Sequence, residues 1–246
     1  MVVSVMNIVI GVIVLLLFIL FVRWFMGTNT KLTGLNDAKK VTKIDSGKLA
    51  QSNSSNYAYS VWFYIQDWSY RYGEPKIILG RLDRELNPSP SIILGAIENN
   101  LKIETSVYPS AQSTTASTHT CNVDNVPVQK WVNAIVSLYG RTMDIYIDGK
   151  LVRSQRFFKK TADNNSAIPS IPPDKEIPVY LGNQNGNFDA YATQFRRWTT
   201  PIDPETGWDV YMKGNGSSKM ASALNDIGID LSILQNNAEI KKFSLM

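Results

Sequence analysis

The chain has very little of the residue types that build disulfides and metal centres. It contains one cysteine, Cys121, and one histidine, His119, among 246 residues. A single cysteine excludes an intramolecular disulfide, and such usage fits a reducing compartment. One Cys and one His cannot supply a typical structural zinc site. We expect Cys121 to be a small buried residue, and His119 to lie in a solvated loop rather than in a catalytic triad.

Signals for nucleotide and nucleic-acid binding are also missing. The sequence has no Gly-Lys-Ser/Thr loop that would cradle a phosphate. Its formal net charge is only +4, and no stripe of basic and aromatic residues is present. We therefore expect no nucleic-acid partner.

One long apolar run stands at the N-terminus. From Met1 to Val22 the only polar side chains are Ser4 and Asn7, and Arg23 and Trp24 follow. A helix needs about 20 apolar residues to cross a bilayer, so we predict a transmembrane anchor over residues 1–26. A cleaved signal peptide is the weaker alternative, because no basic residue precedes the run and no Ala-x-Ala site follows it.

Positive charge follows this run and predicts its orientation. Arg23, Lys31, Lys39 and Lys40 lie on its C-terminal side. Positive flanks stay on the cytoplasmic side, so we expect a single-pass membrane protein whose C-terminal domain faces the cytosol. We expect these four residues and Trp24 to lie at the membrane interface, where the basic ones attract anionic lipid.

The remaining chain divides into three parts. Residues 27–55 are polar and predict a linker with one short edge strand near Val41–Ile44. Residues 56–216 predict one domain with its own core. Residues 217–246 predict a C-terminal extension, in which Leu224, Ile227, Leu231 and Leu234 have helix-like spacing that Gly228 weakens.

The domain's pattern is that of an all-β protein. Short apolar runs alternate with Gly, Pro, Asn and Asp, which predicts an antiparallel sandwich or barrel. Asp148-Gly149 is a favoured pair for a tight hairpin turn, and Asn99-Asn100 separates two further strands. Asp203-Pro204 predicts the start of a short helix that ends near Met212. We expect Ser110–Thr120 to form a loop. The predicted strands cover Tyr59–Ile65, Lys76–Leu82, Ser91–Ile97, Leu101–Tyr108, Trp131–Tyr139, Thr142–Ile147, Leu151–Gln155, Val179–Gly182 and Tyr191–Trp198.

A resemblance narrows the fold. The segments Trp131–Gly140 and Met143–Val152 resemble the signature hairpin of the concanavalin A-like lectin/glucanase superfamily, and are most similar to its laminin-G-like jelly rolls. Tyr59–Ile65 and Tyr180–Trp198 fit the same pattern. The resemblance implies an antiparallel jelly-roll β-sandwich, preceded here by the single transmembrane helix.

A narrower resemblance concerns the whole arrangement. The N-terminal run, the Lys-rich segment, Trp68–Glu74 and Val126–Trp131 are similar to laminin-G-like, membrane-anchored virion proteins of large DNA viruses of algae and amoebae. That resemblance implies a place between an internal membrane and a capsid shell.

Catalytic chemistry is not indicated. Glycosidases of this superfamily carry a Glu-x-Asp-x-Glu strand, since hydrolysis needs two carboxyl groups held close together, and no Glu here lies in such a pattern. We predict no enzyme activity, no cofactor and no metal. Calcium is an open alternative that the resemblance implies on loop carboxylates, for which Asp83, Asp124, Asp163 and Asp189 are candidates without a ligand spacing.

Aromatic residues are the remaining candidates for binding. Trp62, Trp131 and Trp198 lie in predicted strands and are expected in the core. Trp68, Tyr70, Arg71 and Tyr72 lie in a predicted loop, where they either cover one end of the sandwich or bind a sugar or a protein.

Two functional hypotheses result. The first is a non-enzymatic, membrane-anchored structural protein, a minor capsid component that links an inner membrane to other capsid proteins. The alternative is a membrane-tethered lectin that binds carbohydrate.

Overall fold

The computed structural model describes residues 12–18, 32–49, 54–110, 112–157, 167–172, 176–182, 188–216, 229–235 and 238–245. The chain forms two compact units, residues 1–31 and 32–246. In the first unit, residues 12–18 are helical and their apolar side chains are exposed. None of the helices in the described ranges has the length and apolar character needed to cross a membrane. The rest of the predicted 1–26 span lies outside the described residues.

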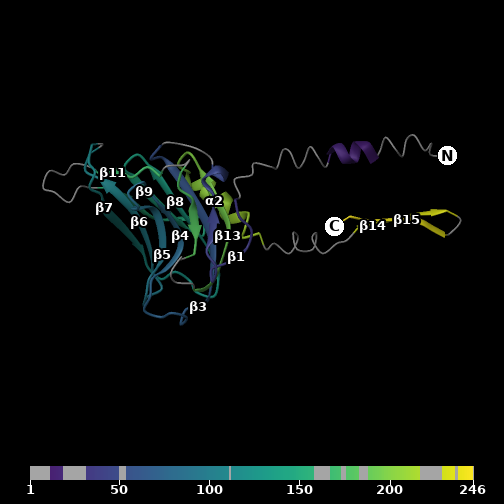
Figure 1. Cartoon of the computed structure of the whole chain (residues 1–246), viewed down its shortest axis with the longest axis horizontal. Helices are drawn as coiled ribbons and strands as arrows, with labels where there is room; N and C mark the ends of the chain where they lie inside the picture. Colours follow the sequence, from purple (N-terminus) through teal and green to yellow (C-terminus); the bar gives the residue numbers. More distant parts are fainter. Residues whose placement is uncertain are drawn as a thin grey trace. The chain divides into compact units, whose positions relative to one another are not determined.

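The second unit is an all-β sandwich of two antiparallel sheets (Figure 1). Sheet A has six strands in the order β1 (Asn36–Asp37), β13 (Asp189–Trp198), β3 (Tyr57–Asp67), β8 (Trp131–Tyr139), β9 (Thr142–Ile147) and β10 (Lys150–Arg156). Sheet B has seven strands, in the order β11 (Ile168–Pro169), β6 (Leu101–Tyr108), β5 (Pro88–Leu94), β4 (Lys76–Leu82), β12 (Val179–Leu181) and β2 (Thr42–Ile44), with β7 (Ser117–Val123) also paired to β6.

The main core lies between the sheets and follows the two-residue period of the strands. On β3, Tyr59, Val61, Phe63 and Ile65 belong to this core. The intervening residues point the other way, because successive side chains of a strand face opposite sides of its sheet. This alternation predicted the sandwich, and the structure confirms it.

A short helix covers the outer face of sheet A. This helix, α2 (Pro204–Met212), begins at the predicted Asp203-Pro204 pair, and the Asp203 carboxylate accepts a hydrogen bond from Thr206 N at 2.7 Å. Val210 packs with Ala58, Ile135 and Tyr146 in a second buried cluster. Both faces of sheet A are therefore buried where α2 lies.

The predicted turn pair Asp148-Gly149 joins β9 to β10 with positive φ angles of 48° and 75°. Such angles at both central residues are the requirement of a type I′ hairpin turn. The β5–β6 connection contains Asn99-Asn100 as predicted, but β5 ends earlier than expected, at Leu94.

The predicted linker differs most from the structure. Within it, Asn36 pairs with Ala192 of β13, and β2 pairs with β12 through Ile44 and Val179. A short 3-10 helix, η1 (Ser46–Lys48), follows, and Ile44 and Leu49 are buried in the main core. Residues 32–49 are thus part of the sandwich. The short edge strand predicted near Val41–Ile44 is present as β2, whereas β1 and the burial of Ile44 and Leu49 were not predicted, because edge strands bury few side chains.

Two further predictions are corrected. Residues 117–120 belong to β7 rather than to a loop, since β7 pairs with β6 over Ser117–Val123. In the C-terminal extension, β14 (Ile229–Gln235) pairs with β15 (Ala238–Leu245), so the helix-like spacing of Leu231 and Leu234 lies on a strand. Leu224 and Ile227 lie outside the described residues.

Candidate functional site

The predicted binding residues lie in the connection between β3 and β4. The N–H and hydroxyl groups of Ser69 both donate to Asp67 Oδ1, at 2.8 and 2.7 Å, and these bonds lower the pKa of Asp67. The Arg71 guanidinium binds Glu74 Oε2 through Nε at 2.9 Å and Nη2 at 2.8 Å. These local bonds give the turn a defined shape, and Glu74 compensates the charge of Arg71.

Trp68 has a structural role that separates it from the other aromatic residues of this turn. It packs against the main core. The ammonium group of Lys76, a buried residue, lies 5.1 Å from its ring centroid. That group also donates to the Arg71 and Glu74 carbonyls at 3.3 Å, and burial lowers the pKa of Lys76. Trp68 therefore covers one end of the sandwich and is no exposed platform for a ligand.

Three connections meet at this end of the molecule. Gly73 N donates to the Ala96 carbonyl at 3.0 Å, which joins the β3–β4 and β5–β6 connections. Val126 N donates to the Asn99 carbonyl at 2.8 Å, which adds the β7–β8 connection. The three carry large apolar side chains that are 39–63% exposed. We call this surface the loop end; its side chains are Tyr70, Tyr72, Ile97 and Val128.

The predicted membrane-interface residues fall in two places. Arg23, Trp24 and Lys31 lie outside the described residues. The Lys39 ammonium group pairs with Asp189 Oδ1 at 3.0 Å, and the hydrogen bond to Asp189 raises the pKa of Lys39. The same ammonium group lies 6.0 Å from the Tyr70 ring centroid. Lys39 and the exposed Lys40 that follows it are therefore part of the sandwich near the loop end.

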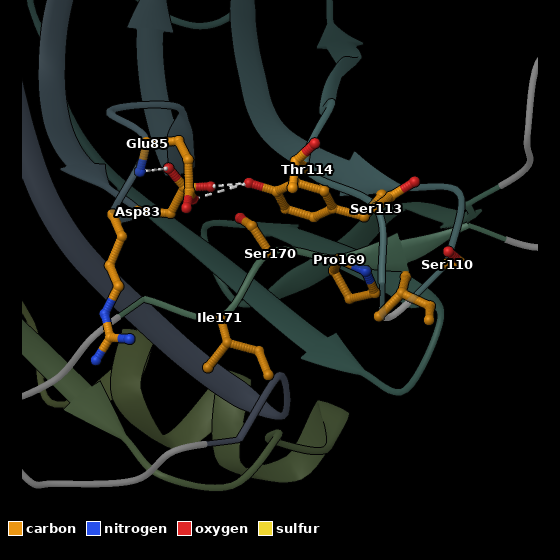
Figure 2. Close-up of a pocket in the computed structure, with 11 residues that line it drawn as sticks. Asp83, Glu85, Ser110, Ser113, Thr114, Pro169, Ser170 and Ile171 are labelled. Carbon is orange, nitrogen blue, oxygen red and sulfur yellow. Dashed lines mark hydrogen bonds between the residues drawn. The ribbon is translucent and has the colours of Figure 1, made fainter.

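The opposite end of the sandwich contains a polar pocket of about 450 Å³. Figure 2 shows Asp83 and Glu85 on one side and the serine and threonine side chains of the β6–β7 connection on another. Apolar surface comes from Ile168 and Pro169 of β11 and from Ile171. We call this the pocket end; the pocket's lining residues are Asp83, Arg84, Glu85, Tyr108, Ser110, Ser113, Thr114, Ile168, Pro169, Ser170 and Ile171.

Asp83 organises the turn that forms one wall. The side chain of this buried residue accepts from Glu85 N at 3.0 Å and from Asn87 N at 2.8 Å. It also accepts from Asn87 Nδ2 at 3.2 and 3.3 Å. These bonds hold the β4–β5 turn, in which Leu86 has a positive φ of 64°. Because both oxygens are occupied, Asp83 is a structural residue and a poor calcium ligand.

Tyr108 links the two acidic residues of the pocket. Its hydroxyl donates to Asp83 Oδ2 at 2.7 Å, and Glu85 Oε2 lies 3.2 Å from the same oxygen. Burial, followed by the hydrogen bond to Asp83 and the charges of both carboxylates, raises the pKa of Tyr108 above its usual range. The phenol is therefore a neutral donor at physiological pH.

Ser170 supplies an unused polar group. The residue is only 2% exposed, and its Oγ has no hydrogen-bond partner. Its backbone is fixed, because Ser170 N donates to the Ser106 carbonyl at 2.7 Å. Figure 2 shows the hydroxyl directed toward the side of the pocket where Asp83 and Glu85 lie. A buried hydroxyl without a hydrogen-bond partner raises the free energy of the folded protein. A ligand oxygen that bonds to Ser170 Oγ would therefore be stabilised.

A shallow aromatic groove lies on the outer face of sheet A, beside the C-terminal end of α2. Trp62 and Trp131 line it together with Tyr211, Met212, Gly214 and Asn215. Trp62 stacks on Tyr211 with ring centroids 5.7 Å apart. Trp62 is buried as expected, with Tyr211 of α2 stacked on it, whereas Trp131 is half-buried, and Trp198 packs against the cluster that contains Val210 of α2.

The remaining candidates have structural surroundings. His119 lies on β7 rather than in a loop, and its ring meets the Phe157 ring edge-on at 5.1 Å. Cys121 is buried as expected, and burial raises the pKa of its thiol. Asp189 is paired with Lys39, Asp124 is exposed, and Asp163 lies outside the described residues. Across the described part of the chain, no three His, Cys, Asp or Glu side chains are grouped as metal ligands.

Sequence reasoning missed the pocket. Tyr108 and Ser170 are far from Asp83 in the sequence and meet it only through the pairing of β6 with β5 and β11. The one local signal was the segment Asp83–Asn87, whose acidic and amide residues are typical of a turn.

Comparison with known proteins supports the fold. Residues 36–206 match the concanavalin A-like lectin/glucanases superfamily through its Laminin_G_3 family. A point mutant of HCR/D has a similar structure, with a TM-score of 0.50 and 15% identity over 73% of this chain and 41% of that chain. The receptor binding domain of botulinum neurotoxin D gives a TM-score of 0.48 and 16% identity over 70% and 41% of the two chains.

The binding domain of botulinum neurotoxin DC, in complex with rat synaptotagmin II, gives a TM-score of 0.49 and 14% identity over 70% and 39% of the two chains. The chain thus spans about two fifths of the length of these three structures. A comparison with curated proteins found no significant match.

Proposed function

Because this chain belongs to the concanavalin A-like lectin/glucanase superfamily, we propose that it is a non-catalytic, membrane-tethered recognition protein whose pocket end binds carbohydrate. The observation that carries the proposal is the unpaired, buried hydroxyl of Ser170 in a pocket of about 450 Å³. Pockets of this size are typical of small-ligand sites.

The lining suits a sugar ring. A pyranose presents C–H groups on its faces and hydroxyl groups around its rim. Ile168, Pro169 and Ile171 supply apolar surface for the faces. Ser170 and the hydroxyl groups of Ser110, Ser113 and Thr114 supply donors and acceptors for the rim, and the exposed Glu85 supplies a charged acceptor. Hydrogen bonds to charged acceptors are the stronger ones.

Binding without cleavage follows from the state of the acidic pair. Glycoside hydrolysis needs one carboxyl group as acid and a second as base or nucleophile. Asp83 is buried, and hydrogen bonds from Glu85, Asn87 and Tyr108 occupy it. A carboxylate so engaged has no free lone pair directed at a substrate. We therefore propose that Asp83 shapes the pocket and that the protein is no enzyme.

The test is a glycan array probed with the full chain and with a matched pair of variants. Ser170→Ala removes the unpaired hydroxyl inside the pocket. Ser106→Ala removes a hydroxyl that is equally buried and unpaired but does not line the pocket. Neither change breaks a hydrogen bond of the side chain, so both variants should fold.

The proposal expects saturable binding to at least one glycan, reduced roughly tenfold in Ser170→Ala, since one hydrogen bond contributes about 1.4 kcal/mol. Ser106→Ala should bind as the wild type does. Equal binding by both variants, or the absence of any saturable binding, contradicts the carbohydrate site. A loss caused by Tyr70→Ser instead would place the sugar at the loop end.

The second candidate is a structural connector between an inner virion membrane and a capsid shell. It is favoured by the resemblance of Trp68–Glu74 and Val126–Trp131 to virion proteins, and by exposed apolar residues at the pocket end, Leu86, Tyr139 and Ile171. Chemical cross-linking within purified particles tests it. Cross-links from the pocket end to a shell protein are expected, and a protein absent from purified particles contradicts it.

Both candidates include the tether, with residues 1–26 in the bilayer and the sandwich on the cytosolic side. Residues 32–246 form a compact unit, so a chain that lacks residues 1–26 should fold and stay in solution. Flotation of this truncated chain with liposomes contradicts the anchor. Protease added to sealed vesicles should reach the sandwich from the cytosolic side alone, and digestion from the lumenal side contradicts the orientation.

A further inference from the structure

We propose that the pocket at the pocket end selects a carbohydrate that carries an ammonium group, namely a hexosamine whose nitrogen is not acetylated. The inference names the ligand class of the site proposed above, so it rests on the proposed carbohydrate binding. The experiment is chosen so that the two can fail separately.

The hydroxyl group of Tyr108 has a single proton for two carboxylates. It donates to Asp83 Oδ2 at 2.7 Å, while Glu85 Oε2 lies 3.2 Å from the same phenol oxygen. Because one O–H group makes one strong hydrogen bond, the proton belongs to the shorter contact. The Tyr108 oxygen and Glu85 Oε2 therefore meet as two acceptors. A ligand that places an N–H donor beside both oxygens would satisfy them together.

Negative charge is in excess around these acceptors. Both oxygens of the buried Asp83 accept hydrogen bonds, which is the arrangement of an ionised carboxylate, and the exposed Glu85 adds a second one. The neighbouring Arg84 binds Glu176 instead, through Nη2 at 3.0 Å and Nε at 3.3 Å. No ion pair among the described residues includes Asp83 or Glu85. This wall of the pocket would therefore attract a cationic ligand and repel an anionic one.

The unpaired hydroxyl of Ser170 is an independent sign of a ligand at this wall. Ser170 is only 2% exposed, and its Oγ has no hydrogen-bond partner. Figure 2 shows this hydroxyl directed toward the side of the pocket where Asp83 and Glu85 lie. A serine hydroxyl can both donate and accept, so it suits a sugar hydroxyl. A sugar bonded to Ser170 Oγ would therefore lie beside the two carboxylates.

The acceptors decide which substituent of the sugar fits. An ammonium group has three N–H donors and no acceptor, and its hydrogen bonds to a carboxylate are charge-assisted. A hydroxyl group has only one proton to donate. The carbonyl of an N-acetyl group would face the oxygens of Tyr108 and Glu85, and the carboxylate of a uronic acid would meet like charge. We therefore expect glucosamine to bind more tightly than glucose, and glucuronic acid to bind least.

A metal ion fits the same wall less well. Calcium takes about six to eight oxygen ligands, but hydrogen bonds from Glu85, Asn87 and Tyr108 already occupy the Asp83 carboxylate. In the part of the chain that the structure describes, no three His, Cys, Asp or Glu side chains are grouped as metal ligands. An ammonium group needs only acceptors at hydrogen-bond distance, and Glu85 and Tyr108 supply them.

The experiment measures equilibrium binding of glucosamine, N-acetylglucosamine, glucose and glucuronic acid to the full chain in detergent, by NMR titration. It is done at about pH 6, where the amine is protonated and the carboxylates are ionised. Glu85→Gln removes the charge at the pocket and keeps the size of the side chain. Glu98→Gln is the matched control, since it makes the same change at an exposed glutamate of the loop end. Both variants lose one negative charge, so an effect of net charge is equal in both.

The wild type should bind glucosamine about tenfold more tightly than glucose, because hydrogen bonds to charged groups are the stronger ones. Glu98→Gln should keep this preference, and Glu85→Gln should reduce it to less than about threefold. A preference that survives in Glu85→Gln overturns the inference, since the ammonium group then binds elsewhere. Equal affinity for Nα-acetyl-lysine amide also overturns it, because an ammonium group without a sugar ring then accounts for the binding.

The glycan array with Ser170→Ala separates this inference from the proposed function. If glucosamine binds no better than glucose while the array shows binding that Ser170→Ala reduces, the pocket binds carbohydrate and the selection for an ammonium group alone is wrong. If the array shows no saturable binding, or binding that Ser170→Ala does not reduce, the carbohydrate site fails and the selection fails with it.

Discussion

The two ends of the sandwich hold their connections in different ways. At the pocket end, one side chain, Asp83, accepts the hydrogen bonds that shape the β4–β5 turn. At the loop end, side-chain bonds such as those of Asp67 and Arg71 stay within one exposed turn, and backbone groups such as Gly73 N and the Ala96 carbonyl join neighbouring connections. A connection held by backbone bonds leaves its side chains free to face a partner, whereas one held by a side chain depends on that residue. Substitutions at the pocket end should therefore lower the free energy of unfolding strongly. Substitutions at the loop end should change it little, except at Trp68.

The largest effect is expected for Asp83→Ala. The change leaves the donors of Glu85, Asn87 and Tyr108 without their acceptor, in a position where Asp83 is buried. We expect the free energy of unfolding to fall by about 3 kcal/mol, together with loss of ligand binding at the pocket. Urea denaturation measures the change. Asp124→Ala, at an exposed aspartate, is the control and should stay within about 0.5 kcal/mol of the wild type.

Trp68→Ala tests the exception at the loop end. Trp68 packs against the core and beneath the Lys76 ammonium group, so its removal should lower the free energy of unfolding by about 2 kcal/mol, less than for a fully buried ring. Tyr72→Ala serves as the comparison within the same turn. If both variants unfold at the same urea concentration, Trp68 is not the structural residue of this loop.

Tyr108→Phe should have a smaller effect that depends on pH. Near pH 7 the lost hydrogen bond to Asp83 should lower the free energy of unfolding by about 1–2 kcal/mol. Because the pKa of Tyr108 is raised in the folded state, its stabilising effect is complete below about pH 10, where an unfolded tyrosine ionises. It decreases as the pH rises further toward the folded pKa.

The stability difference between the wild type and Tyr108→Phe should therefore shrink above about pH 10. Urea denaturation at a series of pH values measures it. Other tyrosines, such as the buried Tyr57, are the same in both proteins and cancel in the comparison. A difference that stays constant up to high pH contradicts the raised pKa.

The smallest effect on stability is expected for the pair Tyr70→Ser and Tyr72→Ser. Both rings are exposed, so the free energy of unfolding should change by less than about 0.5 kcal/mol. Binding at the pocket end should not change either. Thermal unfolding and the glycan array measure these two quantities, and a large fall in stability would show that the rings pack as Trp68 does.

Local patterns in the sequence predicted most of the architecture. The alternation on β3, the Asp148-Gly149 turn and the Asp203 cap each depend on neighbouring residues, and each lies where it was predicted. The errors arose where pairing outweighs local composition. The edge strand predicted near Val41–Ile44 is present, but Asn36–Asp37 forms a further edge strand that was not predicted, because β13 offers it unpaired backbone groups. Residues 117–120 extend β7 because β6 continues beside them.

The candidate sites show the same division. The exposed aromatic turn was identifiable from Trp68–Tyr72, but its composition alone did not separate the packed Trp68 from the exposed Tyr70 and Tyr72. The sequence gave no indication of Ser170, because a serine is a candidate site only when the fold buries its hydroxyl without a hydrogen-bond partner. Trp62 is buried as its strand pattern predicted, but the pattern did not show that its burial comes from Tyr211 of α2 on the outer face of sheet A.

The amino-acid sequence by itself determined the strand periodicity, the tight turns, the short helix and the apolar N-terminal run, since each depends on residues close together in the chain. The tertiary structure alone decided that the segment after residue 31 belongs to the sandwich and that Asp83, Tyr108 and Ser170 share a pocket. It also decided that three connections meet at the loop end and leave four large apolar side chains exposed. These features depend on which strands pair, and strand pairing is a balance of burial and backbone hydrogen bonding over the whole domain.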